Sequence, residues 1–123
     1  MNVDILDKFE KVDLGFKLSH AEFRCKCKAE DCTFTMVNHR IPAAFGIVRK
    51  HWGAPIGVSS GFRCQRHNKE SGGVRDSWHK KGSAIDIFPM DGNLIGLYNL
   101  AKKFFDLIII YEEEGFLHCQ MED

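Results

Sequence analysis

The sequence lacks the features that would direct it to a nucleic acid or into a membrane. Its 17 basic residues are balanced by 17 acidic residues, which gives a formal net charge of +0. Domains that bind nucleic acids normally carry a clustered excess of basic residues, so we expect no nucleic-acid partner. The longest apolar stretch, residues 104–111, is interrupted by Asp106 and is far shorter than the roughly 20 residues of a membrane-spanning helix. We therefore expect no membrane insertion.

An export signal and a disulfide framework are also missing. The first residues include Asp4 and Asp7, where a secretory signal has basic residues followed by an apolar run. The chain has five cysteines, namely Cys25, Cys27, Cys32, Cys64 and Cys119. An odd number cannot all form disulfides within the chain, whereas a small extracellular domain normally pairs its cysteines. We expect synthesis in the cytoplasm.

What is present suits one small globular domain. The chain has 123 residues and 44% hydrophobic content, enough for a single core and too little for two. We expect residues 1–14 to form an N-terminal arm or a short helix, and residues 15–123 to form the domain. No internal repeat or low-complexity tract divides it, and we expect a monomer.

Apolar periodicity predicts the main elements. Residues 37–52 repeat apolar side chains at three- and four-residue steps and end at Gly53, which predicts a helix, with Pro42 in its first turns. A second helical pattern covers residues 94–104, and Ser19 with Glu22 forms a capping box that would start a short helix. Strands are predicted at 56–60, 83–88, 107–111 and 116–120. Helices followed by mixed strands indicate an α+β fold with a mainly antiparallel sheet and flanking helices.

Three residues have the chemistry of a metal site. His79 and Asp86 stand on either side of a tight turn at Gly82, and His118 lies near the C-terminus. Two neutral imidazoles and one carboxylate leave the fourth tetrahedral position of a zinc ion open, as in catalytic zinc sites. The spacing His-x6-Asp is common by chance, and the alternative is an exposed loop histidine beside a strand-end carboxylate.

Strand alternation predicts where these side chains point. Asp86 would share a face with the small residue Ala84. On the last strand, His118 would share a face with Gln120, whereas Cys119 would point into the core.

The surrounding residues are more specific than the spacing. In chain order they are Val58-Ser59-Ser60-Gly61-Phe62-Arg63, Asn68, Gly72-Gly73, Ser77-Trp78-His79, Gly82, Ala84, Asp86 and Gly115-Phe116-Leu117-His118. From about Leu18 to His118, this series resembles the zinc D-Ala-D-Ala carboxypeptidases of peptidase clan MD. Their wider group includes bacterial D-Ala-D-Ala dipeptidases, phage L-alanyl-D-glutamate endopeptidases and the Hedgehog signalling domain.

The resemblance implies a Hedgehog/DD-peptidase-like fold, a Zn²⁺ cofactor and roles for individual residues. It makes His79, Asp86 and His118 the zinc ligands. It makes Arg63 the group that binds a substrate carboxylate or steadies the developing oxyanion, which suits the paired donors of a guanidinium. The alternative for Arg63 is a surface ion pair.

The resemblance also implies a glutamate as general base ahead of the final histidine. Glu112, six residues before His118, matches the spacing of phage-type and Hedgehog-type relatives, and Glu113 and Glu114 are the other candidates. Glu112 shares strand parity with Ile108 and Ile110, which belong to a run, residues 107–111, that is apolar on both faces and is therefore expected to be buried. The alternative is that the three acids form a solvated hairpin tip.

Two residues next to His79 are further candidates for substrate binding. Trp78 would flank the cleft, or else anchor its loop. Ser77 would bond within the turn, and no triad partner makes it a nucleophile.

Two features fit the family less simply. Many carboxypeptidase members have His-x-Asp at the final ligand, and here Gln120 stands in place of that supporting carboxylate. The cluster Cys25, Cys27 and Cys32 would bind a second, structural zinc if His20, His39 or Cys64 supplied a fourth ligand, and otherwise consists of ordinary thiols.

The donor set predicts a zinc hydrolase. The resemblance implies that it is a peptidase that cuts peptidoglycan stem peptides at a bond involving a D-amino acid, as a D-Ala-D-Ala carboxypeptidase or an endolysin-type endopeptidase. The rival is a binding module of the same fold with weak or no hydrolysis, which Gln120 favours and Glu112 and Arg63 oppose. An enzyme without an export signal would reach the cell wall only after release, which suits a phage or prophage setting with a lysis system.

Overall fold

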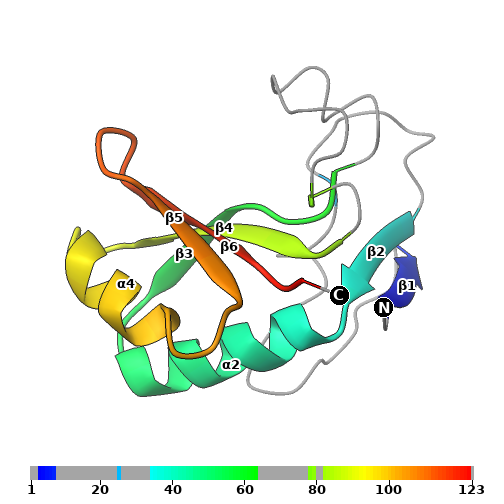
Figure 1. Cartoon of the computed structure of the whole chain (residues 1–123), viewed down its shortest axis with the longest axis horizontal. Coiled ribbons are helices and arrows are strands. Elements are labelled where there is room, and N and C mark those ends of the chain that lie inside the picture. The colour runs from blue at the N-terminus through cyan, green and yellow to red at the C-terminus, as the bar shows by residue number, and fades with distance from the viewer. Residues whose placement is uncertain (1–2, 8–24, 26–33, 64–77, 80–81, 123) are drawn as a thin grey trace.

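A computed structural model describes residues 3–7, 25, 34–63, 78–79 and 82–122. Two helices and six strands lie in these ranges (Figure 1). In chain order they are β1 (Val3–Asp7), β2 (Phe34–Asn38), α2 (Arg40–Trp52), β3 (Ile56–Ser60), β4 (Ala84–Pro89), α4 (Leu94–Ala101), β5 (Leu107–Tyr111) and β6 (Phe116–Gln120). The α+β prediction is confirmed.

The central sheet has four strands in the order β3-β4-β6-β5, and every neighbouring pair is antiparallel. β1 pairs with β2 in a separate two-stranded antiparallel sheet. A strand at Val3–Asp7 therefore stands where an arm or a short helix was expected. The division of the chain at residue 14 stays a prediction.

The two helices cover one face of the central sheet (Figure 1). Strand alternation gives this face the fully buried side chains of Ile85 and Ile87 from β4, and of Leu117 and Cys119 from β6. They pack in one core with apolar side chains of both helices, namely Ile41, Ala44, Phe45, Val48, Leu97 and Ala101. The intervening residues of β4 and β6 consequently point to the opposite face.

Helix α2 begins later than its periodicity predicts. Residues 37 and 38 belong to β2, whose backbone pairs with β1, so the helix starts at Arg40 with Pro42 as its third residue. It ends as predicted, because Gly53 adopts a left-handed conformation with φ 70° and donates its N–H to the carbonyl of Arg49. Helix α4 ends at Ala101, three residues before the predicted end.

The expectation that residues 107–111 are buried on both faces is wrong. Strand β5 is the edge strand of the central sheet, and the helices cover only one of its faces. Leu107, Ile109 and Tyr111 are 39%, 43% and 39% exposed, whereas Ile108 and Ile110 are half-buried against the core. The run is apolar throughout, but it faces the core only at alternate positions.

Among the residues described, neither helix has the length and apolar character needed to cross a bilayer.

Candidate metal centre

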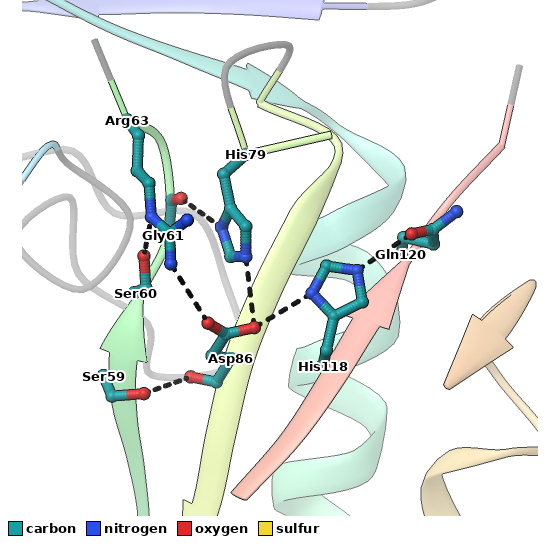
Figure 2. A network of polar contacts seen from close by, with 8 residues as sticks. All are labelled: Ser59, Ser60, Gly61, Arg63, His79, Asp86, His118 and Gln120. Atoms are coloured by element: carbon teal, nitrogen blue, oxygen red, sulfur yellow. Dashed lines mark hydrogen bonds and ion pairs between the residues drawn. The ribbon is translucent and has the colours of Figure 1, made fainter. Parts of the chain in front are cut away.

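The antiparallel register of β4 and β6 places Asp86 directly opposite His118. The side chains of both residues therefore project from the sheet face that the helices leave uncovered. His79, from the turn before β4, points toward the same carboxylate (Figure 2). One ligand atom from each of the three residues lies within 4.8 Å of the others. The structure thus brings together His79, Asp86 and His118, as the sequence analysis expected.

A hydrogen-bonded turn positions His79. Its carbonyl accepts the N–H of Gly82 at 3.2 Å, and the carbonyl of Trp78 accepts the N–H of Ser83 at 3.0 Å. Gly82 has φ 69°, a conformation that a residue with a Cβ rarely adopts, which explains the glycine after the histidine. The N–H of Arg63 also binds the carbonyl of His79, so the chain after β3 is fastened to the turn.

The ring of His79 has one nitrogen fixed by the backbone. Its Nδ1 lies 2.8 Å from the carbonyl oxygen of Gly61, which can only accept, so Nδ1 carries the proton. In the neutral ring, Nε2 then presents a lone pair. That nitrogen lies 3.1 Å from Oδ1 of Asp86.

The ring of His118 is fixed in the same way by Gln120. Its Nε2 lies 2.8 Å from Oε1 of Gln120, an amide oxygen that only accepts, and its Nδ1 lies 3.1 Å from Oδ1 of Asp86. Glutamine stands where the resemblance implies a carboxylate, yet the histidine keeps an acceptor for its outer N–H. Outer acceptors of this kind orient metal-binding histidines.

Two imidazole lone pairs and a carboxylate oxygen therefore converge with no hydrogen between them when the rings are neutral. Such an arrangement is repulsive unless a cation lies between the atoms. Two ligand atoms about 2.1 Å from a tetrahedral zinc lie roughly 3.4 Å apart, close to the separations found between the rings and Asp86. Two nitrogens and one carboxylate oxygen also form a zinc donor set. The residues fit the metal.

Arg63 lies beside the centre and contacts the other oxygen of Asp86. Its guanidinium is 3.5 Å from Oδ2 of Asp86, and its Nε donates to Oγ of Ser60 at 2.9 Å (Figure 2). A register shift in β3, between Val58 and Ser60, inserts Ser59 as an extra residue and brings Ser60 opposite Asp86. The bulge thus directs the chain so that the half-buried Arg63 reaches the carboxylate.

The centre's electrostatics follow from this packing. Burial alone would raise the pKa of Asp86, but hydrogen bonds with His118 and His79 and the charges of their rings lower it to about 2. Burial lowers the pKa of His118, but its hydrogen bonds to Asp86 and Gln120 outweigh this effect and raise the pKa above 6.5. Without metal, a proton on His118 takes the cation's place at pH values below this raised pKa.

These shifts predict how the stability of the metal-free protein depends on pH. The lowered pKa of Asp86 contributes about 2 kcal/mol to the free energy of unfolding. This contribution is present above pH 3.8, the pKa in the unfolded chain, and is lost as the pH falls toward about 2. The raised pKa of His118 contributes stability that is full below 6.5 and is lost as the pH rises through the folded value. Metal binding replaces that proton, so zinc should restore the stability lost at higher pH.

Thermal melts across the pH range, with chelator or with zinc, measure this effect. The melting temperature with chelator should fall on both sides of mildly acidic pH, and zinc should raise it mainly above neutral pH. A chelated protein whose melting temperature stays level through neutrality would contradict the assigned pairing of His118.

Among the described residues, the group of possible metal ligands does not include the three candidate glutamates. Glu112, Glu113 and Glu114 are exposed in the turn between β5 and β6. Their proposed role as base stays a prediction. Trp78 is half-buried next to His79, and Ser77 lies outside the described residues.

The second metal site also stays a prediction. Cys25 is buried, and Cys27, Cys32, Cys64 and His20 lie outside the described residues. His39 is exposed at the N-terminus of α2. Cys119 is buried in the core as predicted, and burial raises the pKa of its thiol, so it is a protonated apolar residue rather than a ligand.

Comparison with protein families agrees with the geometry. The family model described as peptidase M15 matches residues 16–120, most of the chain and all three residues of the cluster. The chain belongs to the peptidase M15 family. M15 peptidases are zinc peptidases, so membership accounts for the donor set and supports a zinc peptidase acting on peptidoglycan. A search of curated proteins finds no match to this M15 chain.

Sequence reasoning missed three supporting groups of this M15 site. The carbonyl of Gly61 is a backbone atom, and no residue pattern indicates it. The role of Ser60 depends on the bulge, which alternation does not reveal. The acceptor role of Gln120 can be predicted from the sequence, since its parity places it on the face of His118 and an amide oxygen accepts a hydrogen bond as a carboxylate does.

Proposed function

We propose that this M15 chain is a zinc-dependent peptidase that hydrolyses peptidoglycan stem peptides at a bond involving a D-amino acid. The main support is the convergence of two ring nitrogens and one carboxylate oxygen on the open face of the sheet, with each ring held by an outer acceptor. Such a centre leaves a coordination position for water and substrate. The preference for D-residues is supported by the family resemblance alone.

Each residue has a distinct role in this proposal. His79, Asp86 and His118 bind the metal. Zinc, when bound, polarises the scissile carbonyl and lowers the pKa of a water molecule to about 7. Arg63, next to Asp86, binds the substrate carboxylate or the oxygen that gains negative charge, for which a guanidinium has paired donors. Glu112 accepts the proton of the attacking water and returns it to the leaving amine.

The proposal is tested by measuring bound zinc and then incubating the protein with purified muropeptides. We expect about one zinc per chain and products that mass spectrometry identifies as shortened stem peptides. Removal of zinc should stop cleavage, and added zinc should restore it. Peptides that differ only in the configuration of one residue would identify the bond that is cut.

The binding-module alternative predicts a different result. Such a protein would contain zinc and bind muropeptides, yet leave all of them intact. Intact substrates with zinc at full occupancy would therefore reject the peptidase proposal.

A further inference from the structure

We propose that an apolar surface on β5 is a substrate subsite, which contacts an apolar side chain on the residue that supplies the scissile carbonyl. This surface, termed the β5 surface, consists of Leu107, Ile109 and Tyr111, and Ile109 is its member nearest the metal centre. The inference rests on the proposed peptidase function, because it requires a peptide that lies over the metal. It adds a residue that selects which side chain precedes the bond that is cut.

One row of residues crosses the central sheet through the metal centre. Ser60 on β3 lies opposite Asp86 on β4, which lies opposite His118 on β6, and Figure 2 shows these three strands in that order. His118 in turn lies opposite Ile109 on β5. Residues directly opposite each other in an antiparallel pair place their side chains on the same face of the sheet. Ile109 therefore projects from the open face beside a metal ligand.

The two sides of this row differ in chemistry, which gives a bound peptide a direction. On the β3 side, the guanidinium of Arg63 lies 3.5 Å from Oδ2 of Asp86 and provides donors for a substrate carboxylate. On the β5 side, the side chain of Ile109 has only apolar atoms. A peptide that directs its carboxyl end to Arg63 and its scissile carbonyl to the metal extends its amino-terminal part toward β5.

Strand spacing places Ile109 within reach of the residue that supplies the carbonyl. Neighbouring strands lie about 4.8 Å apart, so β5 lies about 7 Å from the midline between β4 and β6, which carry Asp86 and His118. The side chain of the substrate residue begins about 2.5 Å from its carbonyl carbon. Apolar atoms in contact lie about 4 Å apart. These two lengths together nearly span the separation, so an apolar side chain on this residue can contact Ile109.

The β5 surface is also more clustered than ordinary exposed apolar residues. Among the described residues, five large hydrophobic side chains are exposed, and three of them form this surface. Single exposed apolar side chains are common, whereas a contiguous apolar patch marks a binding site more often. The ring of Tyr111 also stacks on that of Phe116, with ring centroids 4.7 Å apart. Continuity with the metal centre through the pair of Ile109 and His118 favours the substrate as the occupant.

Three variants of exposed isoleucines test the subsite. Ile109→Thr replaces apolar atoms with a hydroxyl group and should preserve the fold, because threonine is also β-branched and suits an exposed strand. Ile109→Val keeps the surface apolar and is the conservative variant. Ile95→Thr makes the first change at an exposed residue of α4, a helix that covers the opposite face of the sheet, and is the matched control.

The measured quantity is the preference for an apolar side chain, which general damage to the enzyme would not change selectively. Once product analysis has located the cleaved bond, kcat/KM is compared for two stem peptides that carry alanine or glycine before it. Wild type, Ile109→Val and Ile95→Thr should prefer alanine about fourfold, as expected for one buried methyl group. Ile109→Thr should lose most of this preference and keep its zinc affinity. An equal preference in Ile109→Thr and wild type would overturn the inference.

A binding measurement separates the subsite from the proposed function. In zinc-loaded protein with labelled isoleucine methyl groups, a purified muropeptide should shift the NMR signal of Ile109 and leave that of Ile95 unchanged. This shift without any cleavage would reject the peptidase proposal and support the β5 surface as a peptide-binding site. An unshifted Ile109 signal would overturn the inference. A signal that shifts with protein concentration alone would also overturn it, because a second copy of the chain would then cover the surface.

Discussion

Replacing Asp86 with asparagine is expected to weaken zinc binding roughly 100-fold or more and to remove peptidase activity at ordinary zinc concentrations. Structural zinc sites with four protein ligands bind the ion with about 10–16 kcal/mol, or roughly 3 kcal/mol per ligand, and a centre with three protein ligands should lose a similar amount with one of them. Asp86 matters most because Oδ1 faces both histidines while Oδ2 faces Arg63. Asparagine keeps the shape but removes the only negative charge of the cluster.

Two measurements separate metal loss from unfolding. Chelator competition gives the zinc affinity, and far-ultraviolet circular dichroism reports whether the sheet and helices persist. Asp91→Asn is the matched control, because it makes the same chemical change at an exposed residue before α4. If Asp86→Asn bound zinc as tightly as this control, the metal would have to lie elsewhere.

The variant should also lose its response to zinc in thermal melts. Wild-type protein gains stability from a ligand that binds only the folded state, by an amount that grows with the logarithm of its concentration. A protein with an impaired centre gains that stability only at correspondingly higher zinc concentrations. Equal shifts in both proteins would contradict a centre at Asp86.

Sequence patterns predicted the parts of the fold that local rules determine. The hairpin of β5 and β6 has the predicted bounds, because alternation and the left-handed Gly115 are both local features. The end of α2 at Gly53 was predicted for the same reason, because a glycine that caps a helix is also a local feature. Strand β1 was not predicted, since its pairing with β2 joins segments about thirty residues apart and no short-range pattern indicates it.

The exposure of β5 shows a second limit of predicting structure from a sequence pattern. An apolar run indicates a strand but does not tell how many of its faces are covered, which depends on the position of the strand in the sheet. The edge position leaves Leu107, Ile109 and Tyr111 partly exposed, and Ile109 lies directly opposite His118. The open face of the sheet therefore continues from the metal centre onto an apolar surface.

The candidate site was predicted more fully than its surroundings, because side-chain identity carries the metal chemistry. His79, Asp86 and His118 were named from residue type, turn chemistry and strand parity, and the structure brings them together. The contacts that orient them involve a carbonyl of Gly61 and an amide of Gln120. Those contacts depend on distances that only the folded chain sets.

The position of Glu112 in the fold sets a geometric requirement for its proposed role as general base. It begins the turn after Tyr111, the residue that pairs with Phe116 at the end of the hairpin. The pair Ile109–His118 lies three residues away along β5, a separation of about 10 Å. Since a general base acts directly or through one water, Glu112 can be the base only if the turn approaches the metal centre when substrate binds.

Glu112→Gln should therefore lower kcat by about 10²- to 10⁴-fold while leaving zinc affinity unchanged, because the amide cannot accept the proton and the residue is not a ligand. Hydrolysis of a muropeptide under saturating conditions gives kcat, and chelator competition gives the zinc affinity. Glu113→Gln, which removes an equally exposed charge one residue further along the turn, is the matched comparison. Loss of activity in Glu113→Gln instead would transfer the role to Glu113. Full activity in both variants would mean that these two acids form a solvated hairpin tip and that the base lies elsewhere.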